Sequence, residues 1–212
     1  MTTIHSSATR SPAPARQLML DRLMPIHDVR VVQHVVVDAP TDTTYAAIDR
    51  LDLNRDRLVA AIGAVRLLPE RISRRRRAEP PAGSDSDFDR FAAMWTPLAD
   101  VPGDQKVLGL VGAFWERDTG LIKVAAEDFT AFDRPGFGKV AMSYVVSPYG
   151  SGSILTLEIR VVLTDDAARR RFRRYWMLIG PGARFTTTRM LRLIKADAEG
   201  QVPAAGVGAT TS

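Results

Sequence analysis

The hydrophobic pattern near the start of the chain predicts one strand and two helices. The run VRVVQHVVV, Val29–Val37, is mostly β-branched and predicts a strand. Ala39-Pro40 ends it, because proline cannot donate a hydrogen bond to a neighbouring strand. Thr41 can then begin a short helix, TDTTYAAIDR. A second helix is predicted over Arg55–Leu67, where apolar residues recur at helical spacing: Leu58, Ala61, Ile62 and Val65.

The middle of the chain predicts an antiparallel meander. Residues 88–98 are ambiguous, with a short helix around FAAMW as one interpretation. Four later runs have the composition of strands: Val107–Glu116, Leu121–Phe132, Lys139–Ser147 and Ile154–Leu163. Short sequences rich in Asp, Gly and Pro separate them. Connections this short join antiparallel strands, because parallel strands need a long crossover, so a doubly wound parallel sheet is excluded.

The last part of the chain predicts a long helix. Thr164-Asp165-Asp166 is a helix start, with a hydroxyl as the cap and two acids at the positive end. Gly180-Pro181-Gly182 is predicted to interrupt or kink this helix, because proline removes a hydrogen bond. A second helical segment then extends to about Glu199. One apolar stripe follows the spacing of the first segment: Ala168, Phe172, Trp176 and Ile179.

Together these elements predict an α+β helix-grip fold. A curved antiparallel sheet wraps around the long C-terminal helix, and two short helices follow the first strand. The helix must bury its aromatic stripe and the sheet must cover one face. Residues 18–199 are expected to form this single domain. Residues 1–17 and 200–212 are small, polar and without periodicity, which predicts disordered tails, and residues 74–87, RRRRAEPPAGSDSD, predict an exposed loop.

Composition excludes several kinds of chemistry. The chain has no cysteine, so it has no disulfide, no thiolate metal site and no cysteine nucleophile. Phosphate-loop, dinucleotide, nucleophile-elbow and zinc-protease motifs are absent, so no cofactor and no metal are expected. The sequence contains no apolar run of the roughly 20 residues that span a bilayer and no apolar signal segment. We therefore expect a cytoplasmic protein.

Positive charge comes mostly from arginine. The net charge is +5, and lysine occurs at only four positions. Clustered arginine indicates nucleic-acid or anionic-lipid binding, or a compositional bias that also supplies the abundant alanine. Acidic residues interspersed along the chain favour the bias. The run Arg169–Arg174 could bind phosphate, or it could be a solvated helix face.

Several motifs together carry a family resemblance. The order of elements and these motifs resemble the START-like superfamily, also called SRPBCC, of polyketide cyclases and lipid-transfer domains, and within it an uncharacterised actinobacterial branch. The resemblance covers most of residues 21–199 and implies a helix-grip fold with a cavity, without an activity that can be carried over. The motifs are HVVVDAP at His34–Pro40, VLGLVGAFW at Val107–Trp115, EDFTAFDRPGFGK at Glu127–Lys139, EIRVVLTDDAARRRFRRYW at Glu158–Trp176, IGPG at Ile179–Gly182 and the following LRLIKADAE.

The chain departs from that branch at two motifs. Leu157-Glu158-Ile159-Arg160 stands where the branch typically has T-E-T-R, and Pro181-Gly182-Ala183 stands where it has P-G-S. If those threonines or that serine touch a ligand in the branch, the contact is lost here.

His34, Glu158 and Arg160 are the polar candidates for a site. They lie in the first and last predicted strands, which are neighbours in a helix-grip sheet. On the concave face they would anchor a ligand in an apolar pocket, where a carboxylate beside an imidazole orients a hydroxyl or acts as a general base. A buried ion pair that sets the register is a second interpretation. A solvent-facing position is a third, which alternation favours because the apolar face belongs to Leu155, Leu157, Ile159, Val161 and Leu163.

Aromatic and methionine side chains supply the apolar candidates. Such residues more often form ordinary core, yet a helix lying over a curved sheet commonly leaves a void, and concave apolar sites are the usual ligand pockets. The candidates are Phe114, Trp115, Phe129, Met142 and Tyr144 on the predicted strands and Phe172 and Trp176 on the helix.

These observations lead to one expected function and two alternatives. We expect a binding protein for a small hydrophobic ligand such as a lipid, a polyketide or an isoprenoid, held between the sheet and the C-terminal helix. The alternatives are an enzyme of the polyketide cyclase or dehydratase type, acting through His34 and Glu158, and an interaction protein with a collapsed cavity. Nucleic-acid binding is not expected, because the sequence shows neither an aromatic platform on an exposed strand nor a helix-turn-helix unit.

Overall fold

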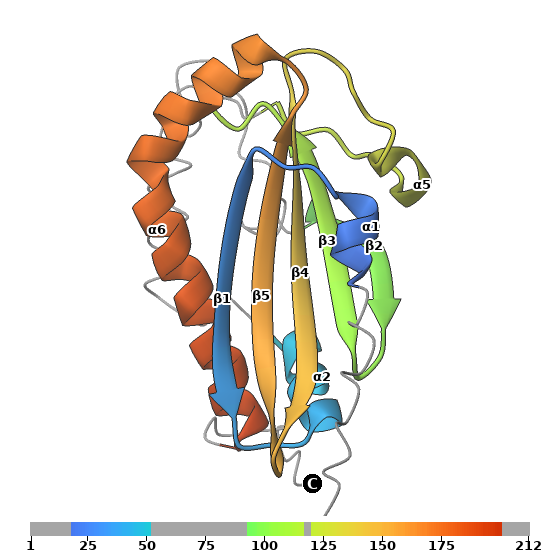
Figure 1. Ribbon diagram of the computed structural model, residues 1–212, viewed down its shortest axis with the longest axis vertical. Helices are drawn as coiled ribbons and strands as arrows, with labels where there is room; N and C mark the ends of the chain where they lie inside the picture. Colours follow the sequence, from blue (N-terminus) through green and yellow to red (C-terminus); the bar gives the residue numbers. More distant parts are fainter. Residues whose placement is uncertain (1–17, 52–92, 117–119, 201–212) are drawn as a thin grey trace, which may run out of the picture.

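The chain folds as a five-stranded antiparallel sheet with one long C-terminal helix (Figure 1). The computed structural model describes residues 18–51, 93–116 and 120–200. The strand order is β1-β5-β4-β3-β2, so β1 and β2 are the edges. The elements in chain order are α1 (Met19–Leu23), β1 (Val29–Val37), α2 (Thr41–Asp49), β2 (Thr96–Val101), β3 (Gln105–Gly112), α5 (Ala126–Phe129), β4 (Gly138–Tyr149), β5 (Gly152–Leu163) and α6 (Asp166–Ala198).

Most predicted strands are confirmed. The bounds of β1 agree with the prediction, and β3, β4 and β5 each overlap a predicted run. β4 and β5 form a hairpin of two 12-residue strands, in which Met142 pairs with Ile159 and Tyr144 pairs with Leu157. The helix predicted from Thr41 is also confirmed as α2. Local β-branched runs and turn residues were sufficient signals for these elements.

One predicted strand is wrong and one observed strand was not predicted. Residues 121–132 form the short helix α5 and a single bridge between Ile122 and Val111. Two consecutive acids at the start of α5 favour the positive end of a helix. β2 fills the place beside β3, although Pro97 argues against a strand. Proline is tolerated there because β2 is an edge strand, and the register shifts between Pro97 and Ala99.

Several predictions fall on residues outside the described ranges. They are the helix over Arg55–Leu67, the exposed loop at 74–87 and the tails at 1–17 and, apart from Gly200, 200–212. Of the segment FAAMW, residues 91–95, only 93–95 are described, and β2 begins directly after them at Thr96.

Helix α6 runs without a break for 33 residues, so the predicted interruption at Gly180-Pro181-Gly182 is wrong. The alternative prediction, a bent helix, agrees with its curved course (Figure 1). Figure 1 shows it as one arc beside the sheet. Pro181 is exposed, on the outer side, where its ring and lost hydrogen bond favour curvature without a contact to the core. The cap is Asp165, whose Oδ1 accepts from the backbone N–H of Ala168 at 2.7 Å. Thr164 instead exchanges hydrogen bonds with the backbone of Phe137.

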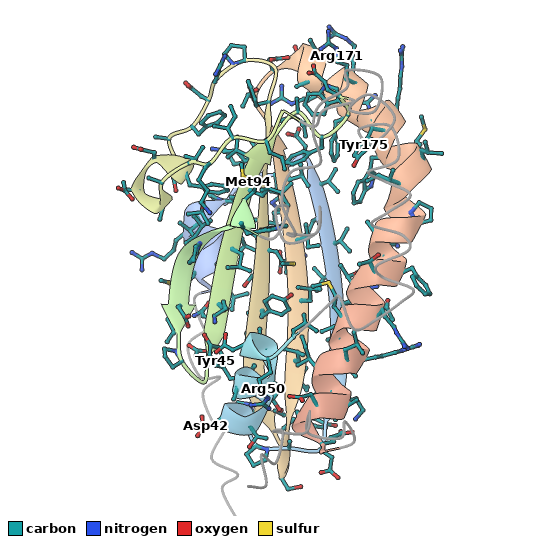
Figure 2. All side chains as sticks on the ribbon, turned by 180° about the vertical axis from the view of Figure 1, so that it is seen from behind. Asp42, Tyr45, Arg50, Met94, Arg171 and Tyr175 are labelled. Atoms are coloured by element: carbon teal, nitrogen blue, oxygen red, sulfur yellow. The ribbon has the colours of Figure 1, made fainter. Side chains whose placement is uncertain are left out.

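The α6 side of the sheet is buried, and the opposite face is buried beneath α1 and Phe129 but exposed along β1. On the α6 side, one core cluster joins the sheet to α2 and the C-terminal half of α6, and a second joins it to the N-terminal half of α6. On the opposite face, Leu20 and Met24 of the α1 region pack with Phe129 against Val107 and Ala141. Figure 1 shows α1 in front of the sheet, and Figure 2, from behind, shows α2 on the other side. The functional candidates therefore divide between two separate faces.

Gly152 is predicted to be essential for the close approach of β5 to the end of β1. A Cβ on Gly152 would lie 2.4 Å from the carbonyl oxygen of Val37, a backbone atom that side-chain rotation cannot move. We expect Gly152→Ala to lower the free energy of unfolding by about 2 kcal/mol, measured by chemical denaturation. Gly182→Ala in α6 is the matched control, because a Cβ there meets nothing within 4 Å. Equal stability of the two variants would contradict the prediction.

Candidate functional site

Five aromatic side chains gather where the N-terminal half of α6 meets the sheet. We call them the aromatic cluster: Phe114, Trp115, Phe172, Tyr175 and Trp176. The ring of Phe172 stacks on Trp176 at a centroid distance of 5.6 Å and an interplanar angle of 18°. It meets Trp115 edge-on at 6.2 Å and lies 5.8 Å from Tyr175. Offset stacked and edge-to-face arrangements of this kind stabilise aromatic pairs beyond their buried area.

Helical spacing and two glycines position these rings. Tyr175 and Trp176 follow Phe172 by three and four residues, so all three rings lie on one face of α6. A Cβ on Gly138 would lie 3.2 Å from the ring of Phe114, and a Cβ on Gly180 would lie 3.3 Å from the indole of Trp176. Small residues at these two positions therefore leave room for the rings.

The aromatic cluster is only partly closed. Phe114 and Phe172 are buried, whereas Trp115, Tyr175 and Trp176 remain partly exposed. A depression of about 520 Å³ opens beside them and is lined by Trp115, Glu116, Arg171, Arg174 and Tyr175. In Figure 2, Arg171 lies at the upper end of α6 and Tyr175 lies one turn further along the helix. The cluster is therefore an apolar surface that meets solvent beside charged side chains.

The rim of this depression is polar. Arg171 Nη1 lies 3.5 Å from Glu116 Oε1. The Nε1 atom of Trp115 is buried, and the part of the chain that the structure describes offers it no hydrogen-bond partner. An indole N–H donates only, so a ligand oxygen at this position would satisfy it.

Met142 and Tyr144 lie further along β4, in the core beneath the C-terminal half of α6 and outside the lining of the depression. Both belong to the core cluster on the α6 side, and they are 9% and 3% exposed. Burial raises the pKa of the Tyr144 phenol, so this group stays protonated. A protonated phenol in apolar surroundings can donate a hydrogen bond to a ligand carbonyl or hydroxyl.

Six of the ten predicted site residues thus lie on the α6 side of the sheet, and four do not. The six are Phe114, Trp115, Met142, Tyr144, Phe172 and Trp176. The other four lie on the opposite face: His34, Phe129, Glu158 and Arg160.

The hypothesis that His34, Glu158 and Arg160 anchor a ligand beneath α6 is wrong. Side chains alternate along β5, and Leu157 and Ile159 already point to the α6 side. The pairing register places His34 opposite Thr156 and Glu158 opposite Val32, so these side chains share the other face. His34 is exposed there. Alternation in the sequence predicted this face correctly.

The solvent-facing interpretation of Glu158 and Arg160 is also wrong, because both are buried as an ion pair at 4% and 5% exposure. Glu158 Oε1 accepts from the Nε atoms of Arg30 and of Arg160, each at 2.7 Å. Arg160 Nη1 donates to the carbonyl oxygen of Met24 at 2.8 Å, and Nη2 pairs with Asp21. The pair therefore connects β5 to β1 and to α1.

Electrostatics keep Glu158 ionised. Burial alone would raise the pKa of this carboxyl, but hydrogen bonds and charges from Arg30 and Arg160 outweigh burial and hold it below its ordinary value of 4.5. A carboxylate held this way is a poor general base, because its proton affinity is reduced. The interpretation as a buried structural pair is the one that this geometry supports.

Phe129 belongs to the core under α1. It is 1% exposed and packs with Leu20 and Val107, and the Nζ atom of Lys139 lies 5.8 Å from its ring centroid. Burial lowers the pKa of Lys139. Phe129 was placed on the wrong face because residues 121–132 were predicted to be a strand.

A second group of titratable side chains ties α2 to the sheet. The Tyr45 hydroxyl donates to Asp100, and Lys106 pairs with Asp49 and, at 3.1 Å, with Asp100. Burial and the hydrogen bond to Asp100 raise the pKa of Tyr45. Figure 2 shows Tyr45 with Asp42 and Arg50 at the end of the molecule far from Tyr175. These hydrogen bonds and ion pairs link α2 to β2 and β3, so we assign the network a structural role.

Sequence reasoning missed several residues of the aromatic surface. Arg171, Arg174 and Tyr175 line the depression. From sequence, the two arginines belonged to a run that could bind phosphate or form a solvated helix face, and Tyr175 was not among the candidates. Tyr175 follows Phe172 by three residues, and this helical spacing could have placed it on the same face of the helix. Met94 and Trp95 also pack against this cluster, and their segment could not be assigned from sequence. All three tryptophans of the chain thus lie at this end of the sheet.

Within residues 18–51, 93–116 and 120–200, no group of three His, Cys, Asp or Glu side chains is arranged to hold a metal ion. In the same ranges, no helix combines the length and apolar character needed to cross a membrane.

Comparison with known proteins adds little. No protein-family model and no curated protein matches this chain. Among solved structures, it is similar to the crystal structure of TTHA0849 from Thermus thermophilus, with 11% sequence identity over 82% of this chain and 100% of that chain and a TM-score of 0.28. A match with so low a TM-score supports no inference about fold or function.

Proposed function

We propose that this chain is a START-like, cytoplasmic binding protein that holds a small hydrophobic ligand, such as a lipid, a polyketide or an isoprenoid, between the sheet and α6. The observation that supports it most is the partly exposed aromatic cluster beside the depression lined by Trp115, Arg171 and Tyr175. Large aromatic side chains that stay partly open to solvent are available for a ligand, whereas rings used only for packing are normally covered.

The chemistry of the surface fits such a ligand. The partly exposed rings of Trp115, Tyr175 and Trp176 offer apolar contact, and the Trp115 indole offers one neutral donor. A mostly apolar lining with a few polar groups binds and orients small hydrophobic molecules. An aliphatic or polycyclic body with one or two oxygens would use both kinds of contact.

The enzyme alternative receives no support from its assigned residues. His34 and Glu158 lie on the face of the sheet opposite the aromatic cluster, and Glu158 is occupied by two arginines. A reaction on the α6 side would have to use other groups.

The direct test is native mass spectrometry of the chain purified from its own host. We expect an additional mass in the range of a lipid or polyketide that is present in stoichiometric amount and is lost on denaturation. Trp176→Ala should reduce its occupancy, because Trp176 stacks on Phe172. Met177→Ala is the matched control, since Met177 is the next residue of α6 but is 71% exposed.

Tryptophan fluorescence is a second test of ligand binding. The three tryptophans adjoin the proposed site, so a ligand should change their emission. If the purified chain carries no bound mass, and its tryptophan emission responds neither to a long-chain fatty acid nor to a polyprenyl alcohol, the proposal is wrong and a collapsed interior is favoured.

A further inference from the structure

Helix α6 has a strongly positive outer surface. It contains eight arginines and one lysine but only two aspartates. Both aspartates are already paired, Asp166 with Arg169 and Asp197 with Arg50. Acidic residues are interspersed elsewhere in the sequence, so this excess is a property of the helix and not only of the composition.

The middle of the same helix exposes large apolar side chains. We call Met177, Leu178, Pro181 and Phe185 the outer patch. Met177, Leu178 and Phe185 are 71%, 83% and 46% exposed, and Pro181 is exposed as well. Leu178, Pro181 and Phe185 are spaced by three and four residues, so they form one row along the helix. Contiguous exposed apolar side chains on a helix normally mark an interaction surface.

The outer patch lies opposite the buried face of the helix. The residues that α6 buries in the core include Phe172 and Met190, on the side that packs against the sheet. Figure 1 shows the arc of α6 with its convex side turned away from the sheet. The outer patch is therefore on the part of the helix that another surface can reach without disturbing the core.

Arginines surround the outer patch on both sides along the helix. Arg174 and Arg171 precede Leu178 by four and seven residues, which places them in the same row. Arg184 adjoins Phe185, and Arg192 follows Phe185 by seven residues. All four arginines are exposed. Arg171 lies beside Glu116, and the long stems of the other three allow their guanidinium groups to reach outward beyond the apolar centre.

We propose that the outer face of α6 docks on an anionic lipid membrane surface. The apolar side chains of the outer patch would enter the boundary between headgroups and acyl chains, and the surrounding arginines would pair with lipid phosphates. A helix with a basic rim and an apolar stripe is the pattern that lies in a membrane interface. A nucleic acid would match the arginines but not the exposed Leu178 and Phe185, because its phosphate backbone offers no apolar partner. The outer patch faces away from the aromatic cluster, and of the four arginines around it Arg171 and Arg174 also line the depression beside that cluster. Docking through the outer patch therefore does not require a bound ligand.

Vesicle co-sedimentation of the full chain tests the proposal. We expect binding to vesicles of phosphatidylcholine with phosphatidylglycerol, weakening as salt increases, and little binding to phosphatidylcholine alone. The double variant Leu178→Glu with Phe185→Glu should weaken binding at least about tenfold, because it replaces apolar contacts by negative charges. Arg184→Gln with Arg192→Gln changes two exposed arginines that do not line the depression, and it should reduce both the affinity and its salt dependence. Tyr149→Glu is the control, because Tyr149 is 57% exposed but lies in the β4–β5 hairpin.

A labelling experiment reports the contact directly. The chain has no cysteine, so Leu178→Cys provides a unique site for a polarity-sensitive fluorophore. Emission should rise and shift to the blue on addition of anionic vesicles, and a label at Tyr149→Cys should not respond. Equal binding of the Leu178 and Phe185 double variant and the unmodified chain would overturn the proposal. So would binding to double-stranded DNA that depends on the arginines but not on Leu178 or Phe185, together with no vesicle binding.

Discussion

Arg160→Met is expected to lower the free energy of unfolding by about 3 to 5 kcal/mol, the range found when one partner of a buried ion pair is removed. The variant leaves the Glu158 carboxylate buried with only the half-exposed Arg30 as its charge partner. It also leaves the carbonyl oxygen of Met24 without its guanidinium donor, and it removes the partner of Asp21. The loss should appear as a lower denaturation midpoint at neutral pH.

Two further variants show whether this loss of stability comes from an uncompensated buried charge or from lost packing. Arg50→Gln breaks the exposed pair with Asp197 and should have only a small effect, because solvent screens such pairs. Replacing both members, Arg160→Met with Glu158→Leu, should cost less than Arg160→Met alone, since no unpaired charge then remains buried. If the double variant is less stable than Arg160→Met, the cost comes from lost packing and not from an uncompensated charge.

The same pair predicts a dependence of stability on pH. The pKa of Glu158 is lowered in the folded chain, so its contribution is fully present above its ordinary value of 4.5 and is lost as the pH falls below it. Glu158→Gln removes this titration. Denaturation measured between pH 7 and pH 3 should therefore show a smaller acid loss of stability in Glu158→Gln than in the unmodified chain. An identical acid loss in both would show that other carboxyl groups account for it.

Phe172→Ala is the second change with a large expected effect, about 3 to 5 kcal/mol of unfolding free energy. Phe172 is 4% exposed and contacts Trp115, Tyr175 and Trp176, so its removal leaves a cavity at the centre of the aromatic cluster. Tryptophan emission should shift to the red in the folded variant, because solvent gains access to the indoles. Chemical denaturation and the emission spectrum measure the two effects.

Phe185→Ala is the matched control for this prediction. It removes the same ring from the same helix, but Phe185 is 46% exposed and belongs to the outer patch. We expect less than about 1 kcal/mol for it, since little apolar surface is uncovered. Similar losses in Phe172→Ala and Phe185→Ala would contradict the assignment of an inner and an outer face to α6.

The secondary structure that the sequence predicted correctly depends on local signals. β1 is a run of β-branched residues, the β4–β5 hairpin encloses a turn with Gly150 at a positive φ of 59°, and α6 begins at a run of acids. Each signal lies within the element or next to it. The alternation in β5 even placed Glu158 and Arg160 on the correct side of the sheet.

The errors arose where distant contacts outweigh local preference. Pro97 argues against a strand, but β2 forms because it is an edge strand that can pair with β3. Pro181 argues against a continuous helix, but packing of Phe172 before it and Met190 after it holds both halves in place. Neither the partner strand nor the core on both sides of a proline can be inferred from neighbouring residues.

The candidate site, too, was predicted in part from local sequence and decided in part by distant contacts. By itself, the sequence determined the α+β class, the strands β1, β4 and β5 and the stripe containing Phe172 and Trp176, because hydrophobic period and turn residues are local properties. Only the tertiary structure decided which candidates come together. α1 has five residues, too few to predict from period, yet it covers part of the second face of the sheet and turns Glu158 and Arg160 into a buried pair. Burial depends on what lies opposite a side chain, and that partner comes from a distant part of the chain.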